Sequence, residues 1–190
     1  ADIVHENAVT FAERFGIDRK NTYEDHKAML ASTEPDIVSI CTPPKTHADI
    51  VIDCAKMGVK AIHSEKPMGG TWGECKEMVA VCESEGVQLT FNHQRRFAKP
   101  YTEAKSALDE GRIGRLRRIE IGGPDLYDYG SHLFDMCGYM TEQEPIKWVL
   151  GQIDCTNENL QYGLHQETEG LARWRYESGV DGFASTGERG

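Results

Sequence analysis

Short apolar strands alternate with helical segments between residues 36 and 91, and no other feature limits the fold as strongly. Three runs rich in β-branched or aromatic residues (DIVSIC at 36–41, KAIHS at 60–64, VQLTF at 87–91) are separated by stretches of helical period. Strands that alternate with helices long enough for a crossover form right-handed βαβ units. We therefore predict an α/β fold with a doubly wound parallel sheet.

The helices of this region are predicted from apolar spacing and from end signals. Ala8–Phe15 has helical period and Gly16 follows it as a stop. A shorter helix is expected around Tyr23–Leu30. Thr46 can cap a helix that runs to Gly58, and Trp72–Ser84 is helical up to the stop at Gly86.

The pattern changes beyond residue 97. Pro100–Asp109 is predicted to be a helix, GRIGRLRRIEI (111–121) ends in a strand, and SHLFDMCGYM (131–140) is a helix with an apolar face. ARWRYESGVDGFAST (172–186) alternates in the manner of two strands, with a turn at Glu177–Gly179. These elements predict a second domain over residues 98–190, after a first domain over residues 1–97.

The charge balance excludes one class of partner. A net charge of -10 argues against nucleic acid, which needs a basic face. No apolar run approaches the length of a membrane span, and the start, ADIVHENAVT, has neither region of a secretory leader. We predict a cytoplasmic protein without a membrane partner. The six cysteines form no C-x-x-C pair and predict reduced thiols and no metal site.

Unusual polar residues follow the ends of all three predicted strands. The loops are CTPPKTH (41–47), SEKPMGG (64–70) and FNHQRRF (91–97). Ligands of doubly wound sheets bind at the carboxyl ends of the strands, so this edge is the expected site. Pro67 pushes Lys66 toward an extended backbone, which gives this lysine a defined direction.

Four motifs, taken in order, resemble the Gfo/Idh/MocA oxidoreductases. They are DIVSICTPPKTH, HSEKP, the pair NHQRRF and GRIGRL, and DYGSHLFD. The resemblance implies an NAD(P)-binding Rossmann domain at residues 1–97. It also implies that residues 98–190 are part of an α/β substrate and oligomerisation domain, built on an open, mainly antiparallel sheet, and that the protein is a homo-oligomer.

The resemblance also places three catalytic residues, which are Lys66, Asp128 and His132. Residues four apart share one face of a helix, so Asp128 and His132 can point at one pocket. A hydroxyl that loses hydride must also lose its proton, and a histidine titrates near neutrality, which makes His132 the expected base. Lys66 would stabilise negative charge on the same oxygen, and Asp128 would orient the imidazole or the substrate.

The resemblance implies a dinucleotide cofactor and a polyol or sugar substrate. Its cofactor-binding residues correspond to Asp2, Thr42, Pro43, His47, Glu65, Lys66 and Asn92, and Arg95 or Arg96 would contact the substrate. Asp2 would bind the adenosine ribose, which favours NAD, with NADP as the alternative. Simpler roles stay open: His47 can begin a helix, Asn92 can cap a turn, Arg96 can be a solvated charge, and Asp2 can cap a helix.

The sequence departs from the family in one informative respect. No G-x-G-x-x-G is present, and only GGP separates Ile121 from Asp125, where the family has a longer strand and loop. We expect that these residues belong to a longer chain, or are its ordered remainder, lacking the first strand and glycine loop. Three functions stay open: a polyol or sugar dehydrogenase, an NAD-dependent glycoside hydrolase, and a non-catalytic interaction protein.

Overall fold

A computed structural model describes residues 1–187, which form two compact units that meet between Asn92 and His93. Each unit has its own hydrophobic core. The sequence places its domain boundary at residues 97/98. The assignment of cofactor binding to the first domain, and of substrate binding and oligomerisation to the second, stays a prediction.

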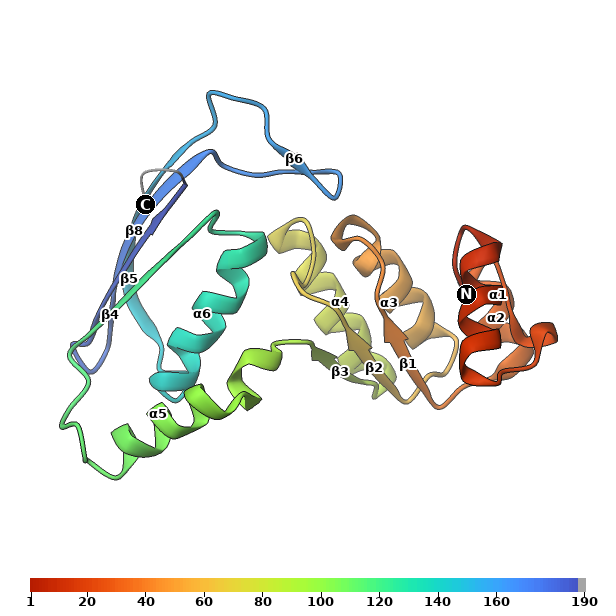
Figure 1. Cartoon of the computed structure of the whole chain (residues 1–190), viewed down its shortest axis with the longest axis horizontal. Helices are drawn as coiled ribbons and strands as arrows, with labels where there is room; N and C mark the ends of the chain where they lie inside the picture. Colours follow the sequence, from red (N-terminus) through yellow and green to blue (C-terminus); the bar gives the residue numbers. More distant parts are fainter. Residues whose placement is uncertain (188–190) are drawn as a thin grey trace. The chain divides into compact units, whose positions relative to one another are not determined.

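The first unit is a parallel three-stranded sheet with helices, as predicted (Figure 1). Its helices are α1 (His5–Phe15), α2 (His26–Thr33), α3 (His47–Lys56) and α4 (Trp72–Glu85), with short 3-10 turns η1 (Arg19–Asn21) and η2 (Pro44–Thr46). Its strands are β1 (Ile37–Ile40), β2 (Ala61–Ser64) and β3 (Gln88–Phe91), in the order β1-β2-β3.

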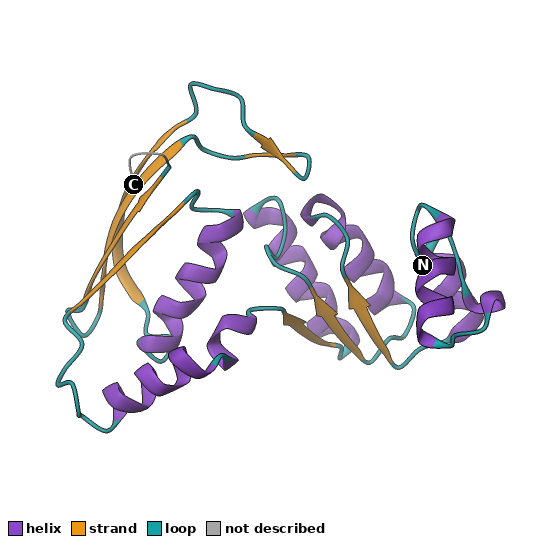
Figure 2. Cartoon of the chain, viewed as in Figure 1, coloured by secondary structure: helices purple, strands orange, loops and turns teal. Residues whose placement is uncertain are grey.

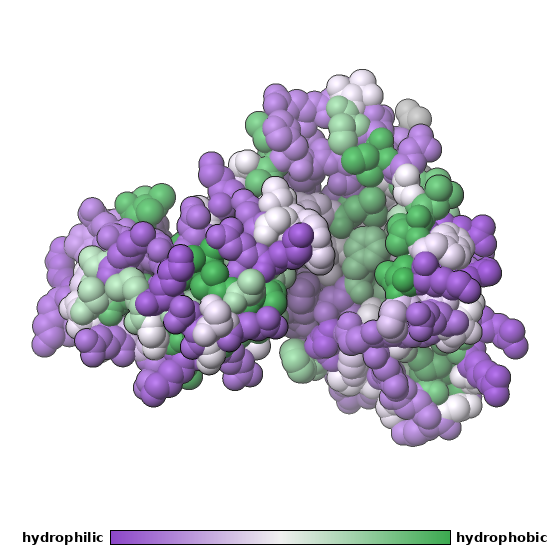
Figure 3. Space-filling view, turned by 180° about the vertical axis from the view of Figure 1, so that it is seen from behind, coloured by the Kyte–Doolittle hydropathy of each residue, from purple (hydrophilic) through white to green (hydrophobic). Residues whose placement is uncertain are grey.

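Alternation along the strands explains this core. Val38, Ile40 and Ile62 point to the same face of the sheet and pack against Val51 of α3 and Met78 of α4. Ile62, Val51 and Met78 are almost fully buried. The surface of this unit that is visible in Figure 3 is largely hydrophilic.

The helix ends agree with the sequence except at α3. Gly16 ends α1 with a left-handed backbone at φ 69°, and Thr71 begins α4 with a reciprocal capping box to Glu74. The prediction that Thr46 caps α3 is wrong. Its backbone is already helical, and its hydroxyl donates back to the Pro43 carbonyl at 2.8 Å. The turn η2 therefore leads directly into α3 without a side-chain cap.

The second unit is a mixed four-stranded sheet with two helices (Figure 2). Its elements are η3 (Gln94–Phe97), α5 (Lys99–Asp109), β4 (Arg118–Gly123), α6 (Asp128–Met140), β5 (Ile146–Asp154), β6 (Leu160–Gln161), β7 (Leu164–His165), β8 (Glu169–Tyr176) and β9 (Asp181–Thr186). The strand order is β4-β9-β8-β5, and β6 pairs only with β7.

The pairing within this sheet is antiparallel at two of its three interfaces. The predicted hairpin is confirmed as β8 and β9, with Gly179 at φ 91° in the turn, whereas β4 pairs parallel to β9. The sequence did not predict β5, because every residue of this strand is exposed and its apolar residues do not alternate cleanly.

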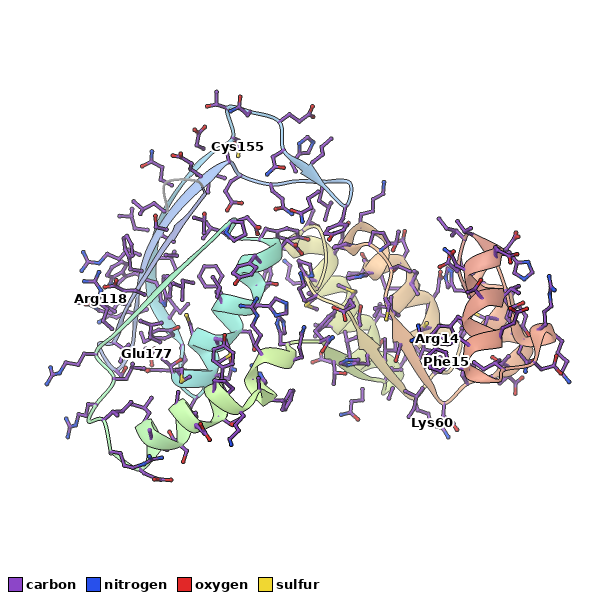
Figure 4. All side chains as sticks on the ribbon, in the orientation of Figure 1. Arg14, Phe15, Lys60, Arg118, Cys155 and Glu177 are labelled. Carbon is purple, nitrogen blue, oxygen red and sulfur yellow. The ribbon has the colours of Figure 1, made fainter. Side chains whose placement is uncertain are left out.

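One face of this sheet packs against α6. Cys137 of α6 lies in the core with Ala172, Trp174 and Ala184. Trp148, Leu150 and Leu171 are exposed, and the strand register places Leu150 opposite Arg173 on the face away from Trp174. Arg118 lies over Phe183 on the same side (Figure 4).

Three cysteines are core residues, in line with their apolar sequence context. Cys54, Cys82 and Cys137 are buried, and burial raises the pKa of the Cys54 thiol to about 11 and that of Cys137 to about 12. These thiols are therefore poor nucleophiles. None of the helices in the described part of the chain has the length and apolar character needed to cross a membrane.

Gly182 tests the packing of the second core. A Cβ at this position would lie 1.9 Å from the indole of Trp174, which is 2% exposed and directly opposite in the β8–β9 register. We expect Gly182→Ala to lower the free energy of unfolding by about 1–3 kcal/mol, because the overpacked indole must shift. Urea denaturation measures this loss.

Gly151→Ala is the matched control in the same sheet. The nearest atom to its added Cβ is 3.7 Å away, an ordinary contact. An equal loss of stability in both variants would contradict the packing argument.

Candidate active site

The candidate site of the first unit begins with strand register. Ile40 of β1 pairs with Ser64 of β2, and Ser64 pairs with Phe91 of β3. The three strands thus end together, and the loops predicted to carry the chemistry leave from one edge of the sheet.

Glu65 organises this edge with both oxygens of its carboxylate. Oε1 accepts a 2.6 Å hydrogen bond from the side-chain amide of Asn92, beyond β3. Oε2 accepts a 3.2 Å hydrogen bond from the backbone N–H of Lys66. Two residues that the sequence assigns to the cofactor are thus brought together beside the backbone of the predicted catalytic lysine.

His47 lies on the other side of the same lysine loop. Its ring is completely buried, with Nδ1 2.9 Å from the Pro67 carbonyl and Nε2 2.8 Å from the Thr42 carbonyl. His47 is also the first residue of α3, as the simpler interpretation of the sequence expects. Its ring, however, joins two loops rather than facing solvent.

The other predicted cofactor residues differ in their surroundings. Thr42 and Pro43 are exposed after β1 and are accessible to a ligand. Asp2 precedes α1, and its carboxylate accepts from the Val4 N–H at 2.8 Å and from the Asn7 amide at 3.3 Å. Residues 1–4 form no strand, and the Asp2 carboxylate holds the turn before the helix.

In the second unit, α6 carries the other two predicted catalytic residues. Asp128 begins the helix and His132 follows one turn later, so both lie on the same face. His132 is 6% exposed, and the ring of His93 meets it edge-on at a centroid distance of 5.9 Å. Asp128 Oδ2 accepts a 3.3 Å hydrogen bond from the Gln161 amide.

The segment between β5 and β8 supports the start of α6. The sequence did not predict this support. The buried Glu167 accepts from the Leu126 N–H just before the helix and from the Thr186 hydroxyl at 3.2 Å. Gln166 is 4% exposed, and its side-chain oxygen and nitrogen have no hydrogen-bond partner within residues 1–187. No local pattern in QYGLHQET predicts these contacts, because they join residues that are 41 and 19 positions apart.

The adjacent arginines of η3 have different partners. Arg96 pairs with Asp135 of α6, with Nε 3.0 Å from Oδ2, so its guanidinium fixes η3 to the helix and is not a solvated charge. Arg95 lies over the ring of Tyr129 at 4.5 Å. Arg95 is therefore the better placed of the two for an oxygen-rich ligand, and the substrate role stays a prediction.

Each unit carries chemically distinct candidate groups. The first unit offers a lysine with a restrained backbone at the edge where dinucleotides bind parallel sheets. The second offers a histidine and a carboxylate one helical turn apart, a combination suited to moving a proton.

Comparison with known proteins identifies the first unit. Residues 1–93 match the family described as "Oxidoreductase family, NAD-binding Rossmann fold". The rhizopine catabolism protein MocA of Rhizobium meliloti is 32% identical over 139 residues, which cover 65% of this chain and 44% of that protein. Inositol 2-dehydrogenase of the same species (strain 1021) is 30% identical over 134 residues, which cover 63% and 40%. The chain spans less than half the length of each of these relatives.

Solved structures agree in fold along nearly the whole chain. The WlbA dehydrogenase from Chromobactrium violaceum, in complex with NADH and UDP-GlcNAcA, aligns with a TM-score of 0.82 at 22% identity, over 98% of this chain and 57% of that one. An inositol dehydrogenase homolog from Azotobacter vinelandii, complexed with NADH and myo-inositol, aligns with a TM-score of 0.82 at 18% identity, over 98% and 54%. At these identities the likeness establishes the fold alone.

Proposed function

Because the chain belongs to the Gfo/Idh/MocA oxidoreductase family, we propose that the complete protein is an NAD(P)-dependent dehydrogenase of a sugar, an inositol or a related polyol. The observation that carries the proposal is the restrained loop of Lys66 after β2. The Lys66 N–H donates to the Glu65 carboxylate, and the carbonyl of the next residue, Pro67, lies 2.9 Å from His47 Nδ1. A relative named inositol 2-dehydrogenase and a fold neighbour solved with myo-inositol support this substrate class.

The carboxyl edge of β1–β3 fits a dinucleotide. The exposed Thr42 and Pro43 would contact it after β1, and the Glu65–Asn92 pair would lie beside its nicotinamide. When bound, the nicotinamide accepts or returns the hydride. NAD is the proposed cofactor. NADP stays the alternative, because the carboxylate of Asp2 is bound within its own turn and gives little support for a choice between the two cofactors at the adenosine ribose.

The side chains of this chain would manage the proton and the charge. Neutral His132 would accept the proton of the substrate hydroxyl, and Lys66 would donate a hydrogen bond to the same oxygen as negative charge develops there. Asp128 would orient the imidazole or a substrate hydroxyl from one turn earlier on α6. In the reverse direction the protonated imidazole would return its proton to the alcohol.

Lys66→Ala tests the proposed role of the lysine in the full-length protein. We expect kcat to fall by about 100-fold or more, with a change of less than about threefold in the Kd for NAD, because the charge on the oxygen appears only in the transition state. Steady-state kinetics and isothermal titration with NAD measure the two quantities.

Lys60→Ala is the control for the loss of a lysine, since Lys60 is exposed and pairs with Asp36 (Figure 4). Equal losses of turnover and of NAD affinity in Lys66→Ala would assign that lysine to cofactor binding or folding. Failure of the wild-type protein to bind NAD or NADP would contradict the dehydrogenase proposal as a whole.

His132→Asn tests the base. In the wild type, kcat/KM for alcohol oxidation should fall as the pH drops through the titration of a histidine near neutrality, because the protonated ring cannot accept a proton. The variant should lose this limb of the profile along with most of its activity. His165→Asn, at an exposed histidine of the same unit, should retain it. A variant profile that still bends at the same pH would exclude His132 as the base.

We further propose a homo-oligomer formed through the outer face of the second sheet. Trp148 and Leu150 of β5, with Leu171 of β8, expose apolar side chains there. Arg173 and Arg175 flank Trp148 on the same face and form cation–π contacts with it. An extended apolar face of this kind is typical of a surface that another protein covers.

Adjacent residues of β5 provide the test. Leu150 (69% exposed) lies on the outer face, whereas Val149 (64% exposed) lies on the opposite one. We expect Leu150→Asp to shift the mass measured by light scattering toward the monomer, because it places a charge in the interface, and Val149→Asp to leave the assembly intact. A monomeric wild type, or equal dissociation by both variants, would contradict this assignment.

A further inference from the structure

His47 is the one buried imidazole of the first unit's described residues whose ring reaches two separate loops. Its exposed fraction is 0%, and its nitrogens lie 2.8 and 2.9 Å from carbonyl oxygens. The Thr42 carbonyl belongs to the loop after β1, and the Pro67 carbonyl belongs to the loop after β2. The histidine therefore connects the ends of two strands at the point where the second loop carries Lys66.

We propose that His47 is a positioning residue, and not a cofactor ligand, which holds the Lys66 loop against the end of β1. Both ring nitrogens already face protein carbonyls, so the ring presents no polar atom to a dinucleotide. The hydrogen-bond contact with Pro67 is not part of the start of α3, because the Pro67 carbonyl is twenty residues away in sequence. For its effect on catalysis, this inference rests on the proposed dehydrogenase function.

The protonation state of the imidazole decides which of these hydrogen bonds form. A neutral ring has one N–H, and it donates to the Pro67 carbonyl when the proton is on Nδ1 or to the Thr42 carbonyl when the proton is on Nε2. A doubly protonated ring donates to both. The proposed support of the Lys66 loop therefore requires a proton on Nδ1.

The backbone of Lys66 is consequently held on both flanks. On one flank, Glu65 accepts from the Lys66 N–H and is itself bound by Asn92. On the other flank, His47 faces the carbonyl of Pro67. The ammonium group is at the end of a flexible side chain, so the position of the backbone decides where that group can reach. A misplacement of about 1 Å can lower a catalytic rate by roughly 100-fold.

Three variants of the full-length protein test this role. His47→Leu keeps an apolar side chain in the buried position and removes both nitrogens, and His47→Gln keeps one N–H donor group. His63→Leu is the control, because His63 is an exposed histidine of β2 whose Nδ1 lies 2.9 Å from the Thr90 hydroxyl of β3 and not from either loop carbonyl. Amide hydrogen exchange is measured over residues 64–69, together with kcat and the Kd for NAD.

We expect His47→Leu to raise exchange at the Lys66 loop by about 10-fold, the factor that the loss of one ordinary hydrogen bond produces. Exchange in α4, the helix that follows this loop in sequence, should stay within about twofold of the wild type. The kcat should fall by about 10- to 100-fold while the Kd for NAD changes by less than about threefold, and His47→Gln should recover part of both losses.

Two results would overturn the inference. One is an unchanged exchange rate at residues 64–69 in His47→Leu, and the other is a loss of NAD affinity as large as the loss of kcat, which would make His47 a cofactor residue. Because hydrogen exchange needs no substrate, it tests the positioning role even if the protein proves to have no dehydrogenase activity. Inactivity of the wild type would contradict the proposed function and leave the exchange result to decide the role of His47.

Discussion

The in-register parallel pairing of β1, β2 and β3 is the constraint on which the candidate site depends. Ile40, Ser64 and Phe91 end their strands side by side, so three loops start from one edge. Side chains that are far apart in sequence can then join those loops, as Glu65 and Asn92 do. A shift of one residue in this register would turn every strand side chain to the other face and separate these partners.

In the second unit, a helix rather than a set of strand ends brings the candidate residues together. A single turn of α6 separates Asp128 from His132, and the segment before β8 holds the start of this helix through Glu167. Arg96 connects the same helix to η3 through Asp135. The proposed base is therefore carried by a helix that is fixed at its beginning and along its side. Rigid support of this kind is what a positioned catalytic group requires.

Local patterns in the sequence predicted much of the fold. The strands of the first unit, the stop of α1 at Gly16 and the β8–β9 hairpin follow from short-range apolar alternation and turn residues. Thr46 was misassigned as a cap because its hydroxyl bonds backward into η2, a choice that residue type alone does not reveal. The strand β5 was missed because it lies at an edge of its sheet, where exposure removes the alternation.

The motifs named the residues of the candidate site but not the contacts between them. The motifs pointed to His47, Glu65 and Asn92 individually. Which carbonyls the imidazole faces, and how the carboxylate divides its two oxygens, depend on distances between loops that no local pattern encodes. The same holds for Arg95 and Arg96, which are neighbours in sequence with partners on different parts of α6.

The hydrogen bond between Glu65 and Asn92 also has a consequence for how this sequence can vary. The two residues are 27 positions apart, and the side-chain amide of Asn92 donates to the carboxylate of Glu65 at 2.6 Å. Replacing the amide alone would leave a half-buried carboxylate short of a donor, and replacing the carboxylate alone would leave the amide without its acceptor. Over evolutionary time, the strand end that carries Asn92 and the loop that carries Glu65 should therefore change together, as a co-varying pair, rather than one at a time.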